Sequence, residues 1–538
     1  MGIVDNFEHL SEIKRWKGSN KKEIRVGLFL VCSILLYIAV WSYISIGKYV
    51  GLTATVFDLG LQIQTAWNLI HYNLGFHEYI YLFLTNALIF LFSPLSLSGN
   101  PVLFLLIQVT FLGFSAIPIY LISKTNFRSS FESLLIALSF LIFFPLSGPA
   151  FFDFHYMVFF IPFFLFGYCF YLKDRYLLSF IFFFLAGSSS PFFFAFIVIF
   201  PVVELLLIFY SNKLKLPLKD SFGGESLQVK RRNFLISLAA ISLVIFIAGY
   251  FVGLTFGVNS ILHINGGRLS LGGFYDTTNV FFFMLIPFFL FPIFSRWIVY
   301  FVPSYSLILL SNNSTYYIPS FYYHQYSSAV IPFIYLGAIQ VLKDNSKVFN
   351  SIKRLLRFDN LQDLRKAIVI GMVFLVIIVG LYYLPYSPET IYPNYSVGSN
   401  ISYNTTEYDT VIAFIELIPK NDPFVLVQNN LPQIYPRDGP DNGVVLVPGD
   451  VGPNITLSDA INNSFPCLAG GGFVKIDYVL ADANNGLNFY NPVNNLFGIA
   501  NPQKDGIQSM AQILQILLQS GAYKVIAEDN GIILVKRI

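Results

Sequence analysis

The first long apolar stretch of the chain, residues 26–43, reads VGLFLVCSILLYIAVWSY and contains no charged residue. A helix that crosses the hydrocarbon core of a bilayer needs about 20 predominantly apolar residues, so this stretch predicts a membrane-spanning helix. It is too long for the apolar region of a cleavable signal peptide, and no small-residue cleavage site follows it. The stretch therefore indicates a signal anchor that remains in the membrane.

The composition extends this interpretation to most of the chain. Of 538 residues, 55% are hydrophobic, 18% are aromatic and only 12% are charged, and the mean hydropathy is +0.63. A soluble domain carries about 25% charged residues. The composition thus predicts an integral membrane protein with many spans. Its basic loops are typical of topology determinants and not of a nucleic-acid site.

The apolar runs predict eleven membrane-spanning helices. They lie at residues 26–46, 101–123, 131–149, 155–172, 177–192, 193–210, 234–256, 280–296, 297–311, 326–342 and 368–386. Segment 79–97 is also apolar but contains Asn86 and Pro94. We expect it to lie parallel to the membrane or to re-enter at the outer surface. Counting it as a span would move Lys124 and Arg128 outside, against the positive-inside rule.

The basic residues set the expected orientation in the membrane. With eleven spans and a cytoplasmic N-terminus, the outer loops before residue 387 contain only two basic residues, Lys48 and Arg268. We therefore expect a multi-pass protein of the cell membrane with a basic cytoplasmic N-terminus at 1–25. A transmembrane domain at 26–386, with its first outer loop at 47–100, then precedes an extracytoplasmic domain at 387–538.

The C-terminal part has a different composition, rich in Asn, Asp, Gly, Pro and Tyr. Helical patterns alternate with strand-like apolar runs, which predicts a compact α/β domain. The helices are expected at 410–418 and 505–520, and the strands at 424–428, 444–447, 478–480, 523–526 and 532–535. The fold class is therefore an α-helical polytopic membrane protein with a C-terminal extracytoplasmic α/β domain. Glycosylation sequons occur in a predicted outer loop of the transmembrane domain and in the C-terminal domain. They lie at Asn313, Asn394, Asn400, Asn404, Asn454 and Asn462.

Two similar strings carry the best candidates for chemistry, Phe57-Asp58-Leu59-Gly60 and Phe152-Asp153-Phe154-His155. Carboxylates are costly near hydrocarbon, so those kept there are functional candidates. Asp58 is a candidate catalytic base in the first outer loop. Asp153 is expected on the same side, with His155 either bonding to it or supplying a cation for a phosphate. The alternative for both acids is a helix N-cap or an interfacial turn.

Further polar residues are expected at the same membrane surface. His77 and Glu78 precede the segment 79–97, and Arg268 follows two glycines in an outer loop. His324 and Gln325 open the tenth predicted span. All five are candidate substrate-binding residues, and for each the alternative is an ordinary interfacial or solvated side chain. The three cysteines, Cys32, Cys169 and Cys467, form no metal-ligand spacing. Two distant carboxylates give no coordination geometry, so no metal site is predicted and the cofactor is left open.

At these residues the chain resembles the domain-of-unknown-function 2079 family of multi-pass membrane proteins. The resemblance rests on the two Phe-Asp strings, on Gln64 with Trp67-Asn68, on Gln108 with Pro118-Ile-Tyr120, and on Tyr323-His324-Gln325-Tyr326 with Pro332. Ile418-Pro419 and the stretch from Gln428 to Arg437 are similar to the tail of the family. One departure is Ser188-Ser189-Ser190, where the family often carries a Lys-Glu-Asp triplet.

More distantly, the first third is similar to GT-C fold glycosyltransferases of the protein mannosyltransferase and aminoarabinose transferase type. His77-Glu78-Tyr79 lies where those enzymes carry a His-Pro-Pro string, here without the prolines. The resemblance implies a polyprenyl-phosphate sugar donor, a protein or lipid acceptor, an outward site and Asp58 as the base. The other function classes are a transporter or lipid flippase, and a non-catalytic envelope scaffold. Few charges lie inside the spans, which argues against ion-coupled transport.

Overall fold

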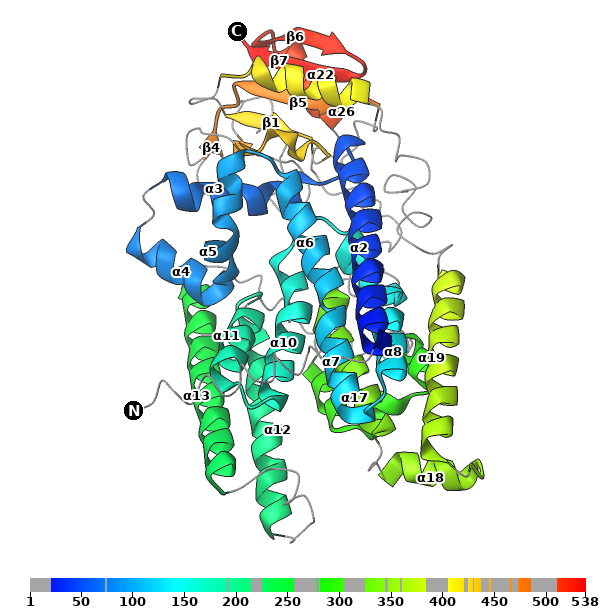
Figure 1. Cartoon of the computed structure of the whole chain (residues 1–538). Coiled ribbons are helices and arrows are strands. Elements are labelled where there is room, and N and C mark those ends of the chain that lie inside the picture. The colour runs from blue at the N-terminus through cyan, green and yellow to red at the C-terminus, as the bar shows by residue number, and fades with distance from the viewer. Residues whose placement is uncertain are drawn as a thin grey trace.

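The structure is a computed structural model of the whole chain. It describes residues 21–72, 75–190, 193–213, 225–255, 278, 281–303, 325–343, 347–358, 360–383, 405–419, 424–428, 430–436, 445–446, 465–466, 473–484 and 510–538. A helical part occupies the middle and one end of the molecule, and a small sheet lies at the other end (Figure 1). We call the end that carries the sheet the sheet end, and the helical end away from it the opposite end.

The first half of the helical part contains most of the long apolar helices. Its elements are α2 Lys21–Val50, η3 Val56–Gly60, α3 Leu61–His71, α4 Phe76–Asn86, α5 Leu88–Phe92, η4 Ser93–Ser98, α6 Val102–Phe114, α7 Ala116–Phe127, α8 Ser130–Leu141, α9 Phe144–Phe151, η5 Tyr156–Phe159, α10 Phe160–Leu172 and α11 Tyr176–Gly187. Segment 79–97 is thus divided among α4, α5 and η4, so it is no single straight helix. Its expected orientation in the membrane stays a prediction.

The second half continues the bundle and ends with α19. Its elements are α12 Phe193–Lys213, α13 Glu225–Thr255, η8 Ile286–Phe288, η9 Phe291–Phe294, η10 Arg296–Tyr300, η12 Gln325–Ala329, α17 Ile331–Leu342, α18 Lys347–Leu355 and α19 Leu361–Tyr383. Figure 1 shows α12 and α13 side by side at the opposite end, while α18 lies across the direction of α19.

Among the described residues, five helices are long and apolar enough to cross a membrane, or six if the bent pair α8 and α9 is one span. The five are Glu23–Val50, Val102–Phe127, Phe193–Tyr210, Gln228–Phe251 and Leu361–Leu381. Shorter apolar helices cover the predicted spans at 155–172, 177–192 and 326–342. The protein is therefore a helical membrane protein, and the count of eleven spans and the sidedness of its termini remain predictions.

The spans predicted at 280–296 and 297–311 are no continuous α-helices where the structure describes them, and whether they cross the membrane stays a prediction. Residues 286–300 form the three short 3-10 helices η8, η9 and η10. Pro287 and Pro292 lack the N–H that an α-helix needs. Phe289 and Leu290 between them have positive φ values of 51° and 59°. The apolar composition of this region identified its burial, but its prolines decided its local structure.

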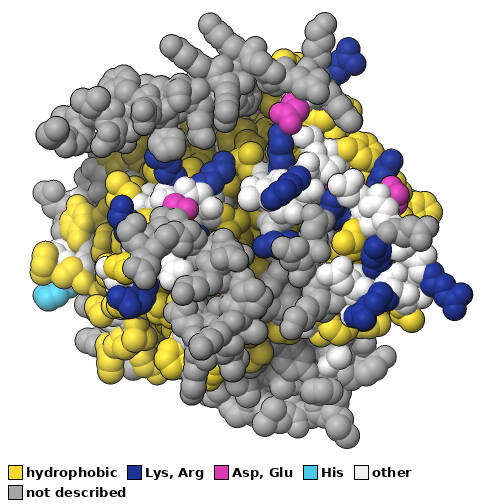
Figure 2. Space-filling model, turned by 60° about the horizontal axis from the view of Figure 1, so that its bottom comes forward, with side chains coloured by type: hydrophobic (Ala, Val, Ile, Leu, Met, Phe, Trp, Pro, Cys, Tyr) yellow, Lys and Arg dark blue, Asp and Glu magenta, His cyan; other side chains and the backbone are white. Residues whose placement is uncertain are grey.

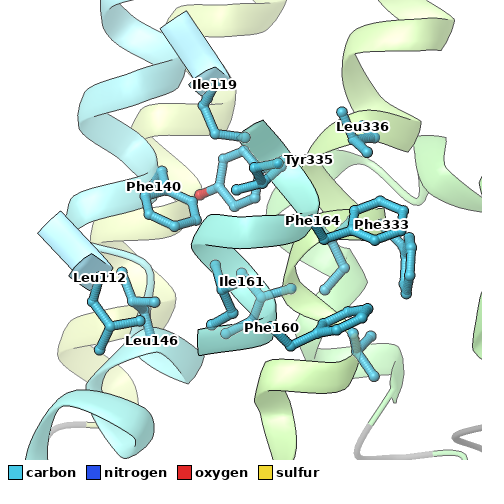
Figure 3. Close-up of a cluster of buried hydrophobic side chains, with 14 of the residues drawn as sticks. Leu112, Ile119, Phe140, Leu146, Phe160, Ile161, Phe164, Phe333, Tyr335 and Leu336 are labelled. Carbon is cyan, nitrogen blue, oxygen red and sulfur yellow. The ribbon is translucent and has the colours of Figure 1, made fainter. Parts of the chain in front are cut away.

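Aromatic and aliphatic side chains fill the centre of the helical part. Phe164 contacts Phe333 edge-to-face at 4.9 Å between ring centroids, which joins α10 to α17. Phe140 of α8 meets Tyr335 of α17 in the same way at 5.2 Å. Figure 3 shows these rings with Ile119, Ile161 and other buried side chains from neighbouring helices. The Phe-rich runs of the sequence are therefore helix-packing surface, as well as surface exposed to lipid.

Two buried glutamates of the helical part are paired with arginines. Glu132 of α8 binds the Nε of Arg365 in α19, and both side chains are buried. Arg365 also donates to the Phe127 carbonyl at 3.1 Å. Glu204 of α12 lies 2.6 Å from Arg296. These pairs satisfy charges that would be costly in a bundle interior.

The C-terminal part is a small mixed sheet between two helices, as the sequence predicts. The strands are β1 Val425–Val427, β2 Val445–Leu446, β5 Tyr478–Asp482, β6 Tyr523–Asp529 and β7 Ile532–Arg537, in the order β2-β1-β5-β7-β6. β1 is parallel to β2 and β5, whereas β7 is antiparallel to β5 and β6. A separate antiparallel pair contains β3 Phe465–Pro466 and β4 Phe473–Val474. Helix α22 Thr405–Glu416 packs on one face, and α26 Met510–Gln519 packs on the other.

The sheet shares its core with the loop after the first helix. Leu52, in the loop after α2, and Val56, the first residue of η3, belong to the same buried cluster as Phe414 of α22 and Val425 of β1. The helix η14 Pro432–Ile434, which follows β1, contacts η3. The C-terminal part is therefore attached directly to the segment that carries Asp58.

Candidate functional site

Asp58 lies in η3, a single turn of π-helix that begins after Thr55. Thr55 is the N-cap, and its hydroxyl accepts from the Asp58 N–H at 3.3 Å. Threonine is a favoured cap because its side-chain oxygen satisfies a backbone donor at the helix start. Single π-turns are frequent at functional sites. Asp58 is half-buried, so its carboxylate is held at a fixed place and keeps some exposure.

Asp153 lies between α9 and η5 and is 1% exposed. One of its oxygens, Oδ2, accepts from the Thr55 N–H at 2.7 Å and from the Thr55 hydroxyl at 2.6 Å. Its other oxygen, Oδ1, lies 2.7 Å from Nζ of Lys48. Asp153 is therefore a buried carboxylate that is fully engaged by protein groups. Its expected alternative role as a helix cap is wrong, since His155 caps η5.

Thr55 brings the two Phe-Asp strings together. Its hydroxyl lies 2.6 Å from Asp153 and 3.3 Å from Oδ2 of Asp58. A hydroxyl has one proton, and the shorter distance assigns that proton to Asp153. The two acids are thus neighbours across a single side chain, although they come from distant parts of the sequence. Only Asp58 of the two retains exposure.

Lys48 is the residue that the sequence analysis missed. It lies in the last turn of α2, is 6% exposed and faces the ring of Phe151 at 4.9 Å. The sequence analysis used Lys48 only to set the orientation in the membrane, as one of two basic residues in the expected outer loops. A buried carboxylate needs a cationic or hydrogen-bonding partner, so a lone lysine near the same surface was the available signal.

Gln108 of α6 fixes the backbone around the second string. Its Nε2 donates to the carbonyls of Pro149 and Phe152 at 2.9 and 3.1 Å. Its Oε1 accepts from the His155 N–H at 2.8 Å. One buried amide therefore makes three hydrogen bonds to the segment that carries Asp153. This explains physically why Gln108 accompanies the Phe-Asp strings in the sequence resemblance.

His155 differs from the expectation. Its ring accepts from the Met157 N–H at 3.4 Å, and its backbone bonds to Gln108, in place of the expected bond to Asp153. His155 is a positioning residue in this structure.

The C-terminal part packs against the segment that contains Asp58. Gln433 of η14 donates from Nε2 to the Tyr49 carbonyl at 2.8 Å and is buried. Tyr49 also contacts the ring of Tyr408 in α22 at 6.0 Å. The Tyr435 ring lies directly against Gly60 at the end of η3. Sequence pattern alone did not connect these residues, because each is local to a different segment.

Replacing Gly60 with alanine is expected to loosen this contact. A Cβ at Gly60 would lie 2.7 Å from the Tyr435 ring, although the backbone angles of Gly60 suit any residue. Overpacking of this kind costs about 1–3 kcal/mol. The apparent Tm of the purified protein should fall, and limited proteolysis near η14 should become faster. Gly27→Ala is the matched control, since a Cβ there meets nothing within 4 Å. Equal Tm values for both variants would contradict the packing argument.

The remaining candidate residues divide into three groups. His77 and Glu78 lie in α4, where His77 is exposed and contacts Phe76 edge-to-face at 6.1 Å. Gln325 begins η12, which packs against α9 and η5 and thus beside the second Phe-Asp string. Outside the described residues lie Arg268, His324 and the sequon residues Asn313, Asn394, Asn400, Asn404, Asn454 and Asn462.

Serines occupy the place of the charged triplet of the resembling family. Ser188 and Ser189 are buried at the end of α11. Their hydroxyls donate to the carbonyls of Phe184 and Ala186 at 2.8 and 2.6 Å. They therefore complete the hydrogen bonding of a helix end. The described residues contain no group of three or more His, Cys, Asp or Glu side chains placed to hold a metal ion.

A family model described as "Predicted membrane protein (DUF2079)" matches residues 48–258. This segment is therefore similar to the DUF2079 family. The match begins at Lys48 and includes Thr55, Asp58, Gln108 and Asp153, so the whole cluster around Thr55 lies within the matched segment. No curated protein matches the chain. The more distant similarity to GT-C fold glycosyltransferases stays a prediction.

Proposed function

We propose that the protein is a membrane glycosyltransferase that uses a polyprenyl-phosphate-linked sugar at the outer membrane face. One observation carries the proposal. Asp58 is a half-exposed carboxylate fixed by Thr55, and it lies beside a second acid that Lys48 neutralises. A base in a transfer reaction needs both access to the acceptor and a fixed position. Asp58 meets both requirements.

The two acids have separate roles in this proposal. Asp58 takes the proton from an acceptor hydroxyl or amide while the acceptor atom forms a bond to the anomeric carbon. The bond from that carbon to the phosphate oxygen breaks, and the polyprenyl phosphate leaves with the electron pair. Attack from the face opposite the leaving group inverts the configuration. Asp153 and Lys48 position Thr55, and Thr55 in turn caps the turn that carries Asp58.

The donor and the acceptor need further contacts. Arg268 and His324 are proposed to meet the phosphate or the sugar, with His77, Glu78 and Gln325 at the same surface. Arginine suits a phosphate because its planar fork donates two parallel hydrogen bonds. The C-terminal part is proposed to bind the acceptor or cover the site, which its contact with η3 supports. Membrane lipids surround the helical part, and the acceptor is a protein or a lipid.

A transporter or flippase receives less support from the structure. Ion-coupled transport relays protons or sodium through acids inside the bundle. Glu132 and Glu204 are each bound to an arginine. Pairing of this kind stabilises helix contacts and leaves these two acids unsuited to a relay. No particular observation favours the scaffold function.

A transfer assay tests the proposal. The full chain is reconstituted in vesicles with radiolabelled polyprenyl-phosphate sugars and a membrane extract that supplies acceptors. We expect labelled sugar on an acceptor, and no labelled product with Asp58→Asn. Movement of the labelled donor across the bilayer without product would support the transporter class and overturn the proposal. The absence of both product and movement across a panel of sugars would also overturn it.

A further inference from the structure

Helix α18 (Lys347–Leu355) connects α17 to α19 at the opposite end of the molecule (Figure 1). One side of this helix is attached to the helical part. Phe349 is fully buried, and Ile352 packs against the main hydrophobic cluster. Residues three and four apart lie on one face of a helix, so these two define an apolar stripe. The stripe fixes which side of α18 faces the protein.

The same apolar stripe continues past the part of the helix that the rest of the protein covers. Leu355 and Leu356 follow Ile352 by three and four residues, and they are 79% and 53% exposed. Phe358, just after the helix, is also 38% exposed. The helix ends at Leu355, and the turn after it contains Arg357, whose φ is 56°. Apolar side chains therefore extend from the core past its edge, at the residues that lead directly into α19.

Basic residues flank the exposed leucines. Arg354 and Arg357 are exposed, and Lys353 is half-buried. Between residues 343 and 366 the chain contains seven basic and three acidic residues. Figure 2 shows Lys and Arg side chains at the opposite end of the molecule with few Asp or Glu among them. The face of α18 is thus both apolar and positively charged.

We infer that the exposed end of α18 and the turn after it, formed by Lys353, Arg354, Leu355, Leu356 and Arg357, bind anionic phospholipid at the membrane surface. An amphipathic helix with basic polar residues lies in the plane of the interface, with its apolar side chains at the acyl boundary. α19 begins at Leu361 and is apolar enough to cross a membrane, so the leucines lie near the level where the bilayer starts. This inference is independent of the proposed transfer activity.

Lipid selectivity tests the inference. The full chain is placed in nanodiscs of mixed phosphatidylcholine and phosphatidylglycerol, and native mass spectrometry gives the ratio of the two lipids that remains bound. We expect a preference for phosphatidylglycerol. Lys353→Gln/Arg354→Gln/Arg357→Gln should reduce it by about fivefold or more, because one Lys or Arg near an anionic surface contributes about that factor.

The matched control removes three charges at the sheet end. Lys475, Lys524 and Lys536 are exposed there, and their replacement by glutamine should leave the lipid ratio unchanged. An unchanged ratio in the α18 variant, or an equal fall in the control, would overturn the inference. If the α18 variant does not fold, the lipid ratio of the unaltered protein is measured at high salt concentration as a second test. About 1 M salt shortens the Debye length to about 3 Å and should abolish the preference of the unaltered protein, and a preference that persists would count against the inference.

Discussion

Replacement of Asp58 with asparagine is expected to reduce sugar transfer by about 10²–10⁴-fold, the usual contribution of a positioned general base. Asparagine has nearly the same shape as aspartate, and its backbone N–H can still donate to the Thr55 hydroxyl oxygen as the Asp58 N–H does at 3.3 Å. It cannot take a proton from the acceptor. Because Asp58 is half-buried, its neutralisation should lower the apparent Tm far less than loss of the buried Lys48–Asp153 pair does.

The pH dependence of the transfer rate distinguishes the loss of a catalytic base from the loss of the folded structure. The initial rate of transfer is measured over a range of pH for the unaltered protein and for Asp58→Asn. The unaltered rate should fall at acid pH as the base becomes protonated, and this acid limb should disappear from the residual activity of the variant. Asp363→Asn is the control, since Asp363 is an exposed acid in the first turn of α19. Full activity of Asp58→Asn would exclude Asp58 as the base.

The sequence predicted the local features of the fold because these depend on local signals. The apolar runs located α2, α12, α13 and α19, and the short apolar runs of the C-terminal part located β1, β5, β6 and β7. The backbone at 286–300 was not predicted, because Pro287 and Pro292 divide this apolar run into short 3-10 helices. Hydropathy indicates burial there, whereas the backbone follows the missing N–H groups.

The site was predicted in part for the same reason. The cost of a carboxylate near hydrocarbon identified Asp58 and Asp153, and charge counting placed both on one side of the membrane. Their contact through Thr55 and the pairing of Asp153 with Lys48 are tertiary contacts between distant segments. Periodicity and spacing contain no information on them. The approach of Tyr435 to Gly60 is hidden in the same way.

Replacement of Lys48 with methionine is expected to destabilise the protein by about 3–5 kcal/mol, the usual cost of removing one partner of a buried ion pair. Lys48 and Asp153 are 6% and 1% exposed, and their charged atoms lie 2.7 Å apart. Methionine preserves the length of the side chain and its contact with the Phe151 ring, so the change removes mainly the charge. Asp153 would remain bound to Thr55 but without a cation.

An exposed pair on the same protein provides the control. Lys124 and Glu23 lie 3.2 Å apart but are 34% and 49% exposed, so Lys124→Met should cost only about 0–1 kcal/mol. Thermal unfolding in detergent, followed by intrinsic fluorescence, should show a much lower apparent Tm for Lys48→Met than for Lys124→Met. Asp153→Ala should be at least as severe, because it also leaves both Thr55 donors without their acceptor. The variant that combines Lys48→Met and Asp153→Ala should lose less stability than the two single variants lose together, since the ion pair is broken only once. Similar Tm values for Lys48→Met and Lys124→Met would mean that the Lys48–Asp153 pair does not hold the two Phe-Asp strings together.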